Sequence, residues 1–224
     1  MINRRKFLIG LTATSVAALS AWSILPRATQ DLLAPVGAAS AEEAASAAEI
    51  KIEDMAMGSP DAKVTLIEYA SFTCPHCANF HANVFGDLKK DYIDTGKVRF
   101  VYREVYFDRY GLWAAMMARC GGEMRYFGIS DILFDTQKDW AHSDDPTVVV
   151  GNLRKIGRSV GMDDASLDAC MKDGATAQAL VTRYEESMKE YNVEGTPTLI
   201  INGEKHSNMS YADLKTILDA KLAE

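Results

Sequence analysis

The sequence predicts an α/β fold in which the sheet-forming chain is interrupted by an inserted helical subdomain. Apolar runs at residues 63–71 and 98–103 have the length and residue types of strands, and the segment between them has apolar residues at helical spacing. A third strand-like run, residues 196–201, lies near the C-terminus. Residues 110–174 separate the second run from the third and contain long stretches of helical character. This order predicts one α/β domain carrying a helical insertion.

The first part of the α/β fold is expected over residues 51–109. Residues 54–61 predict a short strand and a turn, because glycine, serine, proline and aspartate follow one another at 58–61. The strand 63–71 comes next, and a helix is expected from about residue 74 to 92. The apolar stripe of that helix, at i, i+4 and i+8, consists of Phe80, Val84 and Leu88. Alternation of apolar and polar residues at 98–103 predicts the following strand.

The remaining chain is expected to form the insertion, residues 110–174, and the second part of the α/β fold, residues 175–224. Helical stretches in the insertion are expected near 112–120, 126–134 and 148–160. A further helix should span about 175–191. Asn202-Gly203 after the strand 196–201 predicts a tight hairpin, and Ser210 is a suitable N-cap for a last helix to about residue 222.

The N-terminus has the pattern of an export signal. Arg4-Arg5 resembles the start of a twin-arginine signal, and an uncharged apolar stretch follows through Leu25. Small residues at 39–41 suit a signal peptidase, so we expect residues 1–41 to be removed and residues 42–50 to form a flexible lead-in. An uncleaved membrane anchor is the alternative, because residues 7–25 would reach about 28 Å as a helix.

Composition and charge narrow the function classes. The 224 residues are 48% hydrophobic and 25% charged, which fits one domain with an insertion. The formal net charge is −7 and becomes more negative, −10, when the four basic residues and one acidic residue of 1–41 are removed. An acidic chain without lysine or arginine clusters argues against a nucleic-acid partner. Export would place the four cysteines where disulfides persist.

The chemistry centres on Cys74-Pro75-His76-Cys77. The motif lies where the strand 63–71 meets the following helix, so backbone N–H groups and the helix dipole should stabilise a thiolate on Cys74. Pro75 suits the first helical turn, and His76 can direct a hydrogen bond or positive charge toward the Cys74 sulfur. Zinc would need two more ligands at suitable spacing, which the sequence lacks. We therefore expect redox chemistry, no metal and no cofactor.

Three features together resemble the DsbA-like thiol:disulfide oxidoreductases of the thioredoxin superfamily, over about residues 50–222. They are the motif at Cys74, a glutamate six residues upstream at Glu68, and Thr196-Pro197 before a strand, combined with the helical insertion. The resemblance implies a thioredoxin fold with an inserted helical subdomain and implies that Pro197 is cis beside the active site. It also implies a quinone-linked membrane reoxidant like DsbB.

Roles for the site residues follow from the motif and the resemblance. A substrate thiolate is expected to attack Cys74, with Cys77 as the leaving group, and the backbone of Thr196 is expected to pair with an extended substrate. Glu68 is expected to be partly buried and to modulate proton transfer to or from Cys77; an exposed strand carboxylate is the alternative. His81, on the helix after the motif, is expected to lie at the surface or flank of the site rather than to take part in catalysis.

Cys120 and Cys170 are expected to form a second disulfide within the insertion. An exported free thiol beside an oxidase would not stay free, and closing a loop of about 50 residues would stabilise the fold by roughly 4 kcal/mol. The resemblance adds that such a disulfide could tune the active-site potential. We favour a purely structural role.

The function expected from the sequence is that of a periplasmic, monomeric oxidase, which donates the Cys74–Cys77 disulfide to unfolded or reduced exported proteins. A disulfide isomerase or reductase with the same active site is the first alternative. Isomerases of this superfamily are dimers or trimers built by an N-terminal extension, and only a short lead-in precedes the fold here. A peptide-binding chaperone without redox chemistry is the second alternative.

Overall fold

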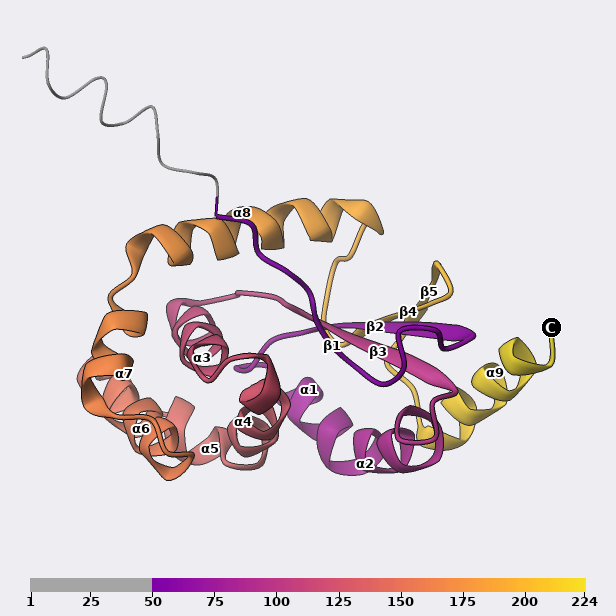
Figure 1. Ribbon diagram of the computed structural model, residues 1–224, viewed down its shortest axis with the longest axis horizontal. Coiled ribbons are helices and arrows are strands. Elements are labelled where there is room, and N and C mark those ends of the chain that lie inside the picture. The colour runs from indigo at the N-terminus through magenta and orange to yellow at the C-terminus, as the bar shows by residue number, and fades with distance from the viewer. Residues whose placement is uncertain (1–49) are drawn as a thin grey trace, which may run out of the picture. The chain divides into compact units, whose positions relative to one another are not determined.

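The computed structural model describes residues 50–224, and within them the chain forms a five-stranded mixed sheet with helices on both faces (Figure 1). The predicted export signal and all but the last residue of the predicted lead-in lie outside the described residues. No helix within residues 50–224 is both long enough and apolar enough to cross a membrane.

The sheet has the strand order β1-β3-β2-β4-β5. The strands are β1 (Met55–Met57), β2 (Val64–Ala70), β3 (Val98–Glu104), β4 (Thr198–Ile201) and β5 (Glu204–Ser207). Central strand β2 pairs in parallel with β3 and antiparallel with β4, which places Glu68 between Tyr102 and Leu199. The predicted strands are confirmed, and Glu68 lies at the middle of the sheet.

The turn between β1 and β2 requires glycine at position 58. Gly58 has φ = +87°, and a Cβ atom at this position would lie 2.5 Å from the carbonyl oxygen of Val98. Only glycine combines this backbone conformation with so close an approach of two chain segments. The turn expected at 54–61 is therefore confirmed, and its glycine allows the turn after β1 to approach the start of β3 closely.

One helical segment follows β2 and runs through four consecutive elements. They are α1 (Pro75–Phe80), η4 (His81–Phe85), α2 (Gly86–Leu88) and η5 (Lys89–Ile93), and η4 and η5 are π-helical. Pro75 occupies the first helical turn with Cys74 as N-cap, as predicted. The sequence predicted the extent of this helix but not its two π-turns, which are rare and often lie at functional sites.

The insertion between β3 and the next sheet helix contains five helices. They are α3 (Arg109–Cys120), α4 (Glu123–Asp135), α5 (Gln137–Ala141), α6 (Pro146–Ser159) and α7 (Asp164–Met171). Figure 1 shows them grouped at one end of the sheet. Aspartate side chains cap α3, α6 and α7 by accepting backbone N–H bonds. The sequence predicted α3, α4 and α6 and missed the two shortest helices.

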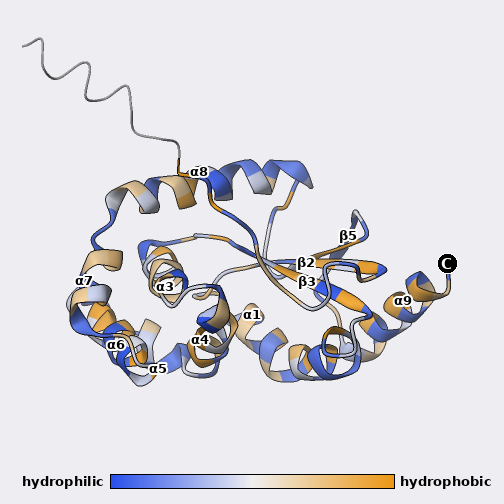
Figure 2. Ribbon diagram, viewed as in Figure 1, coloured by the Kyte–Doolittle hydropathy of each residue, from blue (hydrophilic) through white to orange (hydrophobic). Residues whose placement is uncertain are grey.

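Two apolar layers enclose the sheet. Helix α8 (Gly174–Glu190) covers one face, where Tyr69 and Ile200 are buried, and the segment 75–93 together with α9 (Tyr211–Ala223) covers the other (Figure 1). Figure 2 shows the hydrophobic residues of β2 and β3 between these layers. Ser210 caps α9 by accepting the N–H of Asp213, as predicted. The larger layer continues into the insertion, so the two share one core.

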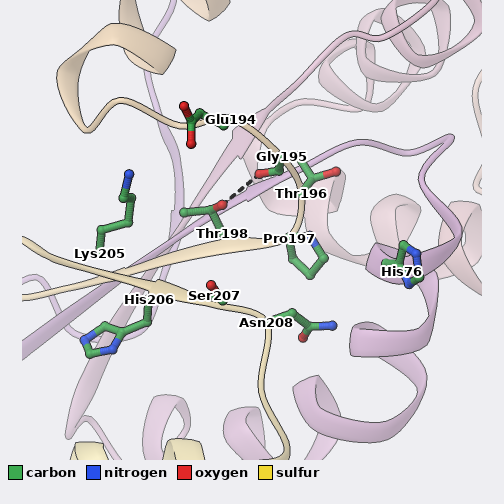
Figure 3. Close-up of a pocket in the computed structure, with 10 residues that line it drawn as sticks. All are labelled: His76, Glu194, Gly195, Thr196, Pro197, Thr198, Lys205, His206, Ser207 and Asn208. Carbon is green, nitrogen blue, oxygen red and sulfur yellow. Dashed lines mark hydrogen bonds between the residues drawn. The ribbon is translucent and has the colours of Figure 1, made fainter.

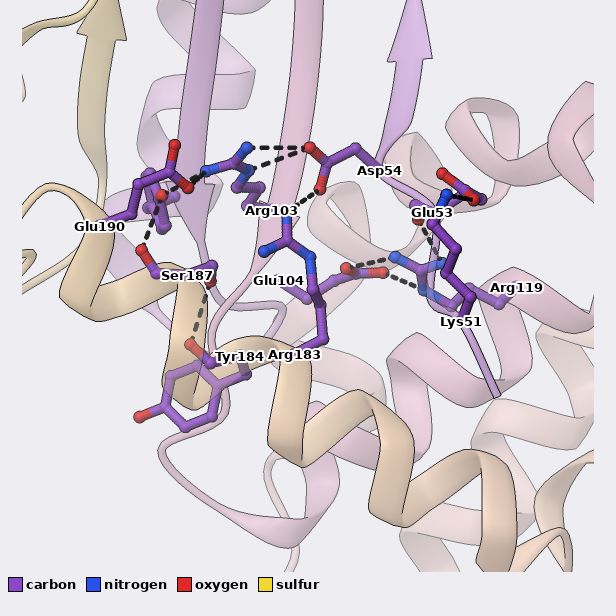
Figure 4. A network of polar contacts seen from close by, with 11 residues as sticks. Lys51, Glu53, Asp54, Arg103, Glu104, Arg119, Arg183, Tyr184, Ser187 and Glu190 are labelled. Carbon is purple, nitrogen blue, oxygen red and sulfur yellow. Dashed lines mark hydrogen bonds and ion pairs between the residues drawn. The ribbon is translucent and has the colours of Figure 1, made fainter. Parts of the chain in front are cut away.

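A polar network fixes the chain just before β1 (Figure 4). The carboxylate of Asp54 accepts hydrogen bonds from Arg103 and from Arg183 at 3.0 to 3.1 Å. Beside it, Arg119 makes two bonds of 2.7 Å to Glu104, which also accepts a bond from Tyr126. Through Glu53 and Asp54 the network joins the residues just before β1 to β3, α3 and α8.

Candidate active site

The two motif cysteines lie at the junction between β2 and α1. Cys74 is the N-cap of α1, and its N–H donates to the carbonyl oxygen of Ser71 at 3.1 Å. The hydroxyl of Thr73 donates to Asp108, the N-cap of α3, at 2.8 Å. The structure holds Cys74 and Cys77 as free cysteines. The strand, the motif helix and the insertion therefore meet at the reactive turn.

Cys74 is the acidic thiol of the pair. A hydrogen bond from Cys77 is the main cause that lowers the pKa of Cys74 to about 5, and further bonds come from the Thr196 side chain and from the backbone N–H groups of Cys77 and His76. Burial opposes this shift and is outweighed. Cys74 is 8% exposed, so its side chain is mostly covered by protein but still has some surface accessible to solvent. The arrangement produces a nucleophile and leaving group at neutral pH.

Cys77 has the opposite character. It is fully buried, and burial raises its pKa strongly, with further increases from its hydrogen bond to Cys74 and from the negative charge of Glu68. Cys77 therefore remains a thiol across the physiological pH range and donates to the Cys74 thiolate. The two sulfurs therefore differ in chemistry, because Cys74 is stable as a thiolate and Cys77 is not.

Thr196 and Pro197 complete the site from the opposite end of the sequence. The Thr196–Pro197 peptide bond is cis, and the carbonyl oxygen of Thr196 lies 3.6 Å from the Cys74 sulfur. The Thr196 hydroxyl is buried without a hydrogen-bond partner of full geometry in the described part of the chain, and its proximity to the two sulfurs lowers the pKa of both cysteines. The segment before β4 thus contacts the reactive sulfur through its backbone and its side chain.

An open cavity of roughly 580 Å³ lies beside this segment (Figure 3). Its floor is formed by Gly195, Thr196 and Pro197, and His76 faces the hollow from the motif helix. The hydroxyl of Thr198 donates to the carbonyl oxygen of Gly195 at 2.7 Å and holds this bend. The cavity adjoins Cys74 through Thr196, whose carbonyl oxygen contacts the Cys74 sulfur.

His76 lies in the first turn of the motif helix and is exposed. The sequence suggested that its ring would direct a hydrogen bond or charge to Cys74, but the ring is exposed and makes no hydrogen bond to any residue from 50 to 224. The backbone N–H of His76, and not its ring, is among the groups that lower the Cys74 pKa. The ring is directed to solvent because it lies on the open side of the first helical turn.

Glu68 and His81 form a buried pair, and the charge of its carboxylate acts on Cys77. Glu68 is fully buried, more deeply than predicted, and its Oε2 lies 3.1 Å from Nε2 of His81. The prediction that His81 lies at the surface was wrong, because its side chain is 5% exposed. The rings of Phe85 and Phe134 stack on its two faces at centroid distances of 4.6 and 4.0 Å. Phe134 comes from the insertion, which the local sequence pattern around His81 did not reveal.

Gln137 is a site residue that the sequence analysis missed. Its side-chain amide donates to the carbonyl oxygens of Phe72 and Cys74 at 2.8 and 3.0 Å. Gln137 begins α5, a five-residue helix of the insertion. Nothing in the sequence marks a lone glutamine as a partner of a turn more than 60 residues away.

Cys120 and Cys170 are joined by a disulfide with a Cα–Cα distance of 5.9 Å. The bond links the C-terminal ends of α3 and α7 and so ties the two helices of the insertion together. Within residues 50–224 no cluster of three or more histidine, cysteine or acidic side chains is arranged to hold a metal ion.

Comparisons with known proteins identify the family of this chain. Residues 51–220 match the family model described as thioredoxin. A protein of Rickettsia bellii named "Putative protein-disulfide oxidoreductase" is 30% identical over 177 residues, which cover 79% of this chain and 67% of the relative. The chain spans 61 to 67% of the length of the rickettsial relatives that it matches.

Solved structures give the same result. Alpha-DsbA1 of Wolbachia pipientis has a TM-score of 0.72 and 26% identity, and the match covers 78% of this chain and 93% of that one. A structure described as a protein-disulfide isomerase of Novosphingobium aromaticivorans has a TM-score of 0.69 and 26% identity, and the match covers 77% and 100%. With the sheet order, the helical insertion and the buried cysteine pair, these findings assign the chain to the DsbA-like thiol:disulfide oxidoreductases of the thioredoxin superfamily.

Proposed function

We propose that the protein is a thiol:disulfide oxidase that donates the Cys74–Cys77 disulfide to reduced exported proteins. The observation that carries this proposal is the contrast between the two thiols, with the Cys74 pKa lowered to about 5 and that of Cys77 strongly raised. Stabilising one thiolate favours the reduced enzyme over its disulfide, and an enzyme whose reduced form is stabilised passes its disulfide to substrates.

The reaction begins when a substrate thiolate attacks the Cys74 sulfur of the disulfide and Cys77 leaves. A mixed disulfide between Cys74 and the substrate results. A second substrate thiol then attacks the substrate sulfur of this bond, and Cys74 departs as a stable thiolate. The enzyme ends as a dithiol, and a membrane reoxidant of the DsbB type would restore its disulfide.

Substrate would lie in the cavity beside Thr196 and Pro197, where an extended chain can pair with the backbone next to Cys74. Glu68 would accept or donate the proton that Cys77 exchanges during the reaction, because it is buried and its charge acts on Cys77. We further propose that residues 1–41 direct export, that the site works in the periplasm, and that the enzyme is a monomer.

Disulfide isomerisation is the second candidate, favoured by the similarity to the Novosphingobium structure described as an isomerase. Both activities use the same two cysteines and differ in the reduction potential of the pair. The potential is measured by equilibrating the purified protein with glutathione and scoring the Cys74–Cys77 peptides by mass, separately from Cys120–Cys170. A value near about −120 mV, as in DsbA, supports the oxidase, whereas about −200 mV or below favours the isomerase or reductase.

Trapping with variants tests the order of events. Cys74→Ala should abolish oxidation of a peptide with two thiols, and Cys77→Ala should accumulate mixed disulfides between Cys74 and substrate. Full oxidase activity in either variant contradicts the mechanism. Peptide binding that survives in Cys74→Ser, without turnover by the parent protein, would indicate the non-redox chaperone instead.

A further inference from the structure

The buried Glu68–His81 pair has polar atoms without partners at both of its ends. Glu68 Oε2 is bonded to His81 Nε2, but Glu68 Oε1 and His81 Nδ1 are both buried without a hydrogen-bond partner among residues 50–224. Buried polar atoms in native proteins are nearly always paired, so two such atoms in one pair call for an explanation. A pair with one open acceptor and one open ring nitrogen can receive a proton at one end and release one at the other.

The carboxylate of the pair acts on the buried thiol through its charge. The charge of Glu68 raises the pKa of Cys77 and also acts on Tyr102, the residue opposite Glu68 on β3. Glu68 Oε2 is bonded to His81, and Oε1 is buried without a partner in the described part of the chain, so the carboxylate keeps an open acceptor. Cys77 needs to exchange a proton, because it leaves as a thiolate at a position that is fully buried.

The outer end of the pair lies toward α4 of the insertion. Asp131, an exposed residue of α4, is close enough to His81 for their charges to interact, and Asp135 and Lys89 act on the same carboxylate. Although the residue as a whole is exposed, neighbouring atoms partly desolvate the Asp131 carboxylate and raise its pKa, and the charges of His81 and Lys89 oppose this increase. Around His81 the titratable neighbours are therefore Glu68 from β2, Tyr102 from β3, Asp131 from α4 and Cys77 from α1. Asp131 is the neighbour that reaches solvent.

We propose that His81 is the residue through which Glu68 exchanges protons with solvent, so that Glu68 and His81 form a two-residue proton relay for Cys77. This inference rests on the thiol-exchange function proposed above and deepens it. His81 is a positioning and relaying residue rather than a catalytic residue, because Glu68 stands between it and the reacting sulfur.

The relay balances charge in the first chemical step. A substrate thiolate forms a bond to the Cys74 sulfur, the Cys74–Cys77 bond breaks, and its electron pair moves to the Cys77 sulfur. One proton passes from the His81 imidazolium to Glu68, and Glu68 delivers one to the Cys77 thiolate. His81 is left neutral and regains a proton from solvent on the Asp131 side. The reverse transfer removes the proton when Cys77 attacks a mixed disulfide.

Two substitutions separate proton transfer from packing. His81→Gln keeps a donor for Glu68 but cannot carry a proton at neutral pH. His81→Ala opens a slot between the rings of Phe85 and Phe134 that free imidazole can fill, and pyrazole has the same size but takes up no proton near pH 7. His142→Gln is the matched control, because His142 is exposed and lies in the insertion away from the pair. The Cys74 thiolate, followed by ultraviolet absorbance, should keep its titration near pH 5 in every variant.

The measured quantity is the single-turnover rate at which the oxidised full-length protein reacts with glutathione from pH 5 to 9, by acid quench and mass of the Cys74–Cys77 peptides. We expect His81→Gln to lower this rate about tenfold at pH 7 and to change its pH profile. Imidazole should restore the rate of His81→Ala, and pyrazole should not. A wild-type profile in His81→Gln, or equal rescue by both rings, overturns the proposal.

A measurement on the unmodified protein covers the case in which these variants do not fold. The ring nitrogen shifts of His81, followed by nuclear magnetic resonance across pH 4 to 9, should show a more highly protonated ring in the oxidised than in the reduced protein at the same neutral pH. Identical titrations in the two redox states overturn the relay. Glutathione reacts with oxidases and isomerases alike, so a reduction potential that contradicts the proposed oxidase function leaves this test intact.

Discussion

The side-chain amide of Gln137 donates a hydrogen bond of 3.0 Å to the carbonyl oxygen of Cys74. A second bond, 2.8 Å long, joins the same amide to the carbonyl oxygen of Phe72. One glutamine of the insertion therefore fixes the backbone on both sides of Thr73. The insertion contributes to the geometry of the reactive turn as well as covering the sheet.

Gln137→Met should destabilise the protein and slow thiol exchange. Methionine has similar length but no donor, so the carbonyl oxygen of Phe72 loses its side-chain partner and that of Cys74 keeps only the N–H of Ala78. The expected cost is about 1 to 3 kcal/mol in the free energy of unfolding. Chemical denaturation measures the stability change, and the glutathione reaction measures the rate. Lys138→Met changes the adjacent, exposed residue and serves as the control. Unchanged stability and rate in Gln137→Met would show that the reactive turn keeps its conformation without the Gln137 hydrogen bonds.

The low pKa of Cys74 predicts how the equilibrium with glutathione depends on pH. Above pH 5 the reduced enzyme carries Cys74 as a thiolate and Cys77 as a thiol, so its formation from the disulfide and two glutathione thiols releases one proton. The equilibrium constant for reduction should therefore rise roughly tenfold per pH unit between about pH 6 and 8 and level off below pH 5. A constant independent of pH in this range contradicts an acidic Cys74.

Thr196→Val should raise the Cys74 pKa. The hydroxyl of Thr196 stabilises the thiolate, and a hydrogen bond of this kind is worth up to about one pKa unit. Thiolate absorbance at 240 nm during an acid titration gives the value. Thr196→Ser keeps the hydroxyl and is expected to titrate as the parent does. If valine leaves the titration unchanged, the backbone N–H groups and Cys77 account for the shift.

Replacing Cys120 and Cys170 with serine should reduce stability without changing the Cys74 titration. The disulfide closes a loop with a sequence separation of 50, for which chain entropy gives roughly 4 kcal/mol. Denaturation of the Cys120→Ser/Cys170→Ser variant measures this loss. A shift in the reduction potential of Cys74–Cys77 at unchanged Cys74 pKa would assign the second disulfide a tuning role, against the structural one that we favour.

Asp54→Ala should destabilise the fold and leave the active site unaffected. The change removes the shared acceptor of Arg103 and Arg183 and leaves two half-buried guanidinium groups without it, at a cost of about 1 to 3 kcal/mol. Lys51→Ala is the control. It removes a solvent-exposed ion pair between Lys51 and Glu53 and should change the free energy of unfolding by less than about 0.5 kcal/mol. If Asp54→Ala lowers the free energy of unfolding no more than Lys51→Ala does, the network adds nothing to stability.

Local signals explain why most of the fold could be predicted from the sequence. The strands β2 and β3, the Asn202-Gly203 hairpin and the cap at Ser210 each depend on residues within a few positions of one another. The short helices α5 and α7 were missed because five and eight residues are too few for a helical period to be clear.

The candidate site was predicted only as far as its motif extends. Cys74, Cys77 and the position of Glu68 follow from the chain around them. The burial of His81 depends on Phe134, and the reactive turn depends on Gln137, and both residues belong to the insertion. Contacts across 50 or more residues leave no periodic pattern in the chain, so neither relationship could be read from the sequence.

The Thr196 carbonyl and the Cys74 sulfur are 122 residues apart in the chain, and this separation has a consequence for biosynthesis. A ribosome completes the Cys-Pro-His-Cys motif long before it adds the segment that carries Thr196. A nascent chain therefore contains two cysteines in a helical motif but lacks the hydroxyl that helps acidify one of them, the strand β4 that flanks Glu68, and the floor of the cavity. We therefore expect the sulfur to reach its full acidity only after residues 196–224 have been added and β4 has joined the sheet, so the cysteines of incomplete chains should be less acidic than those of the finished enzyme.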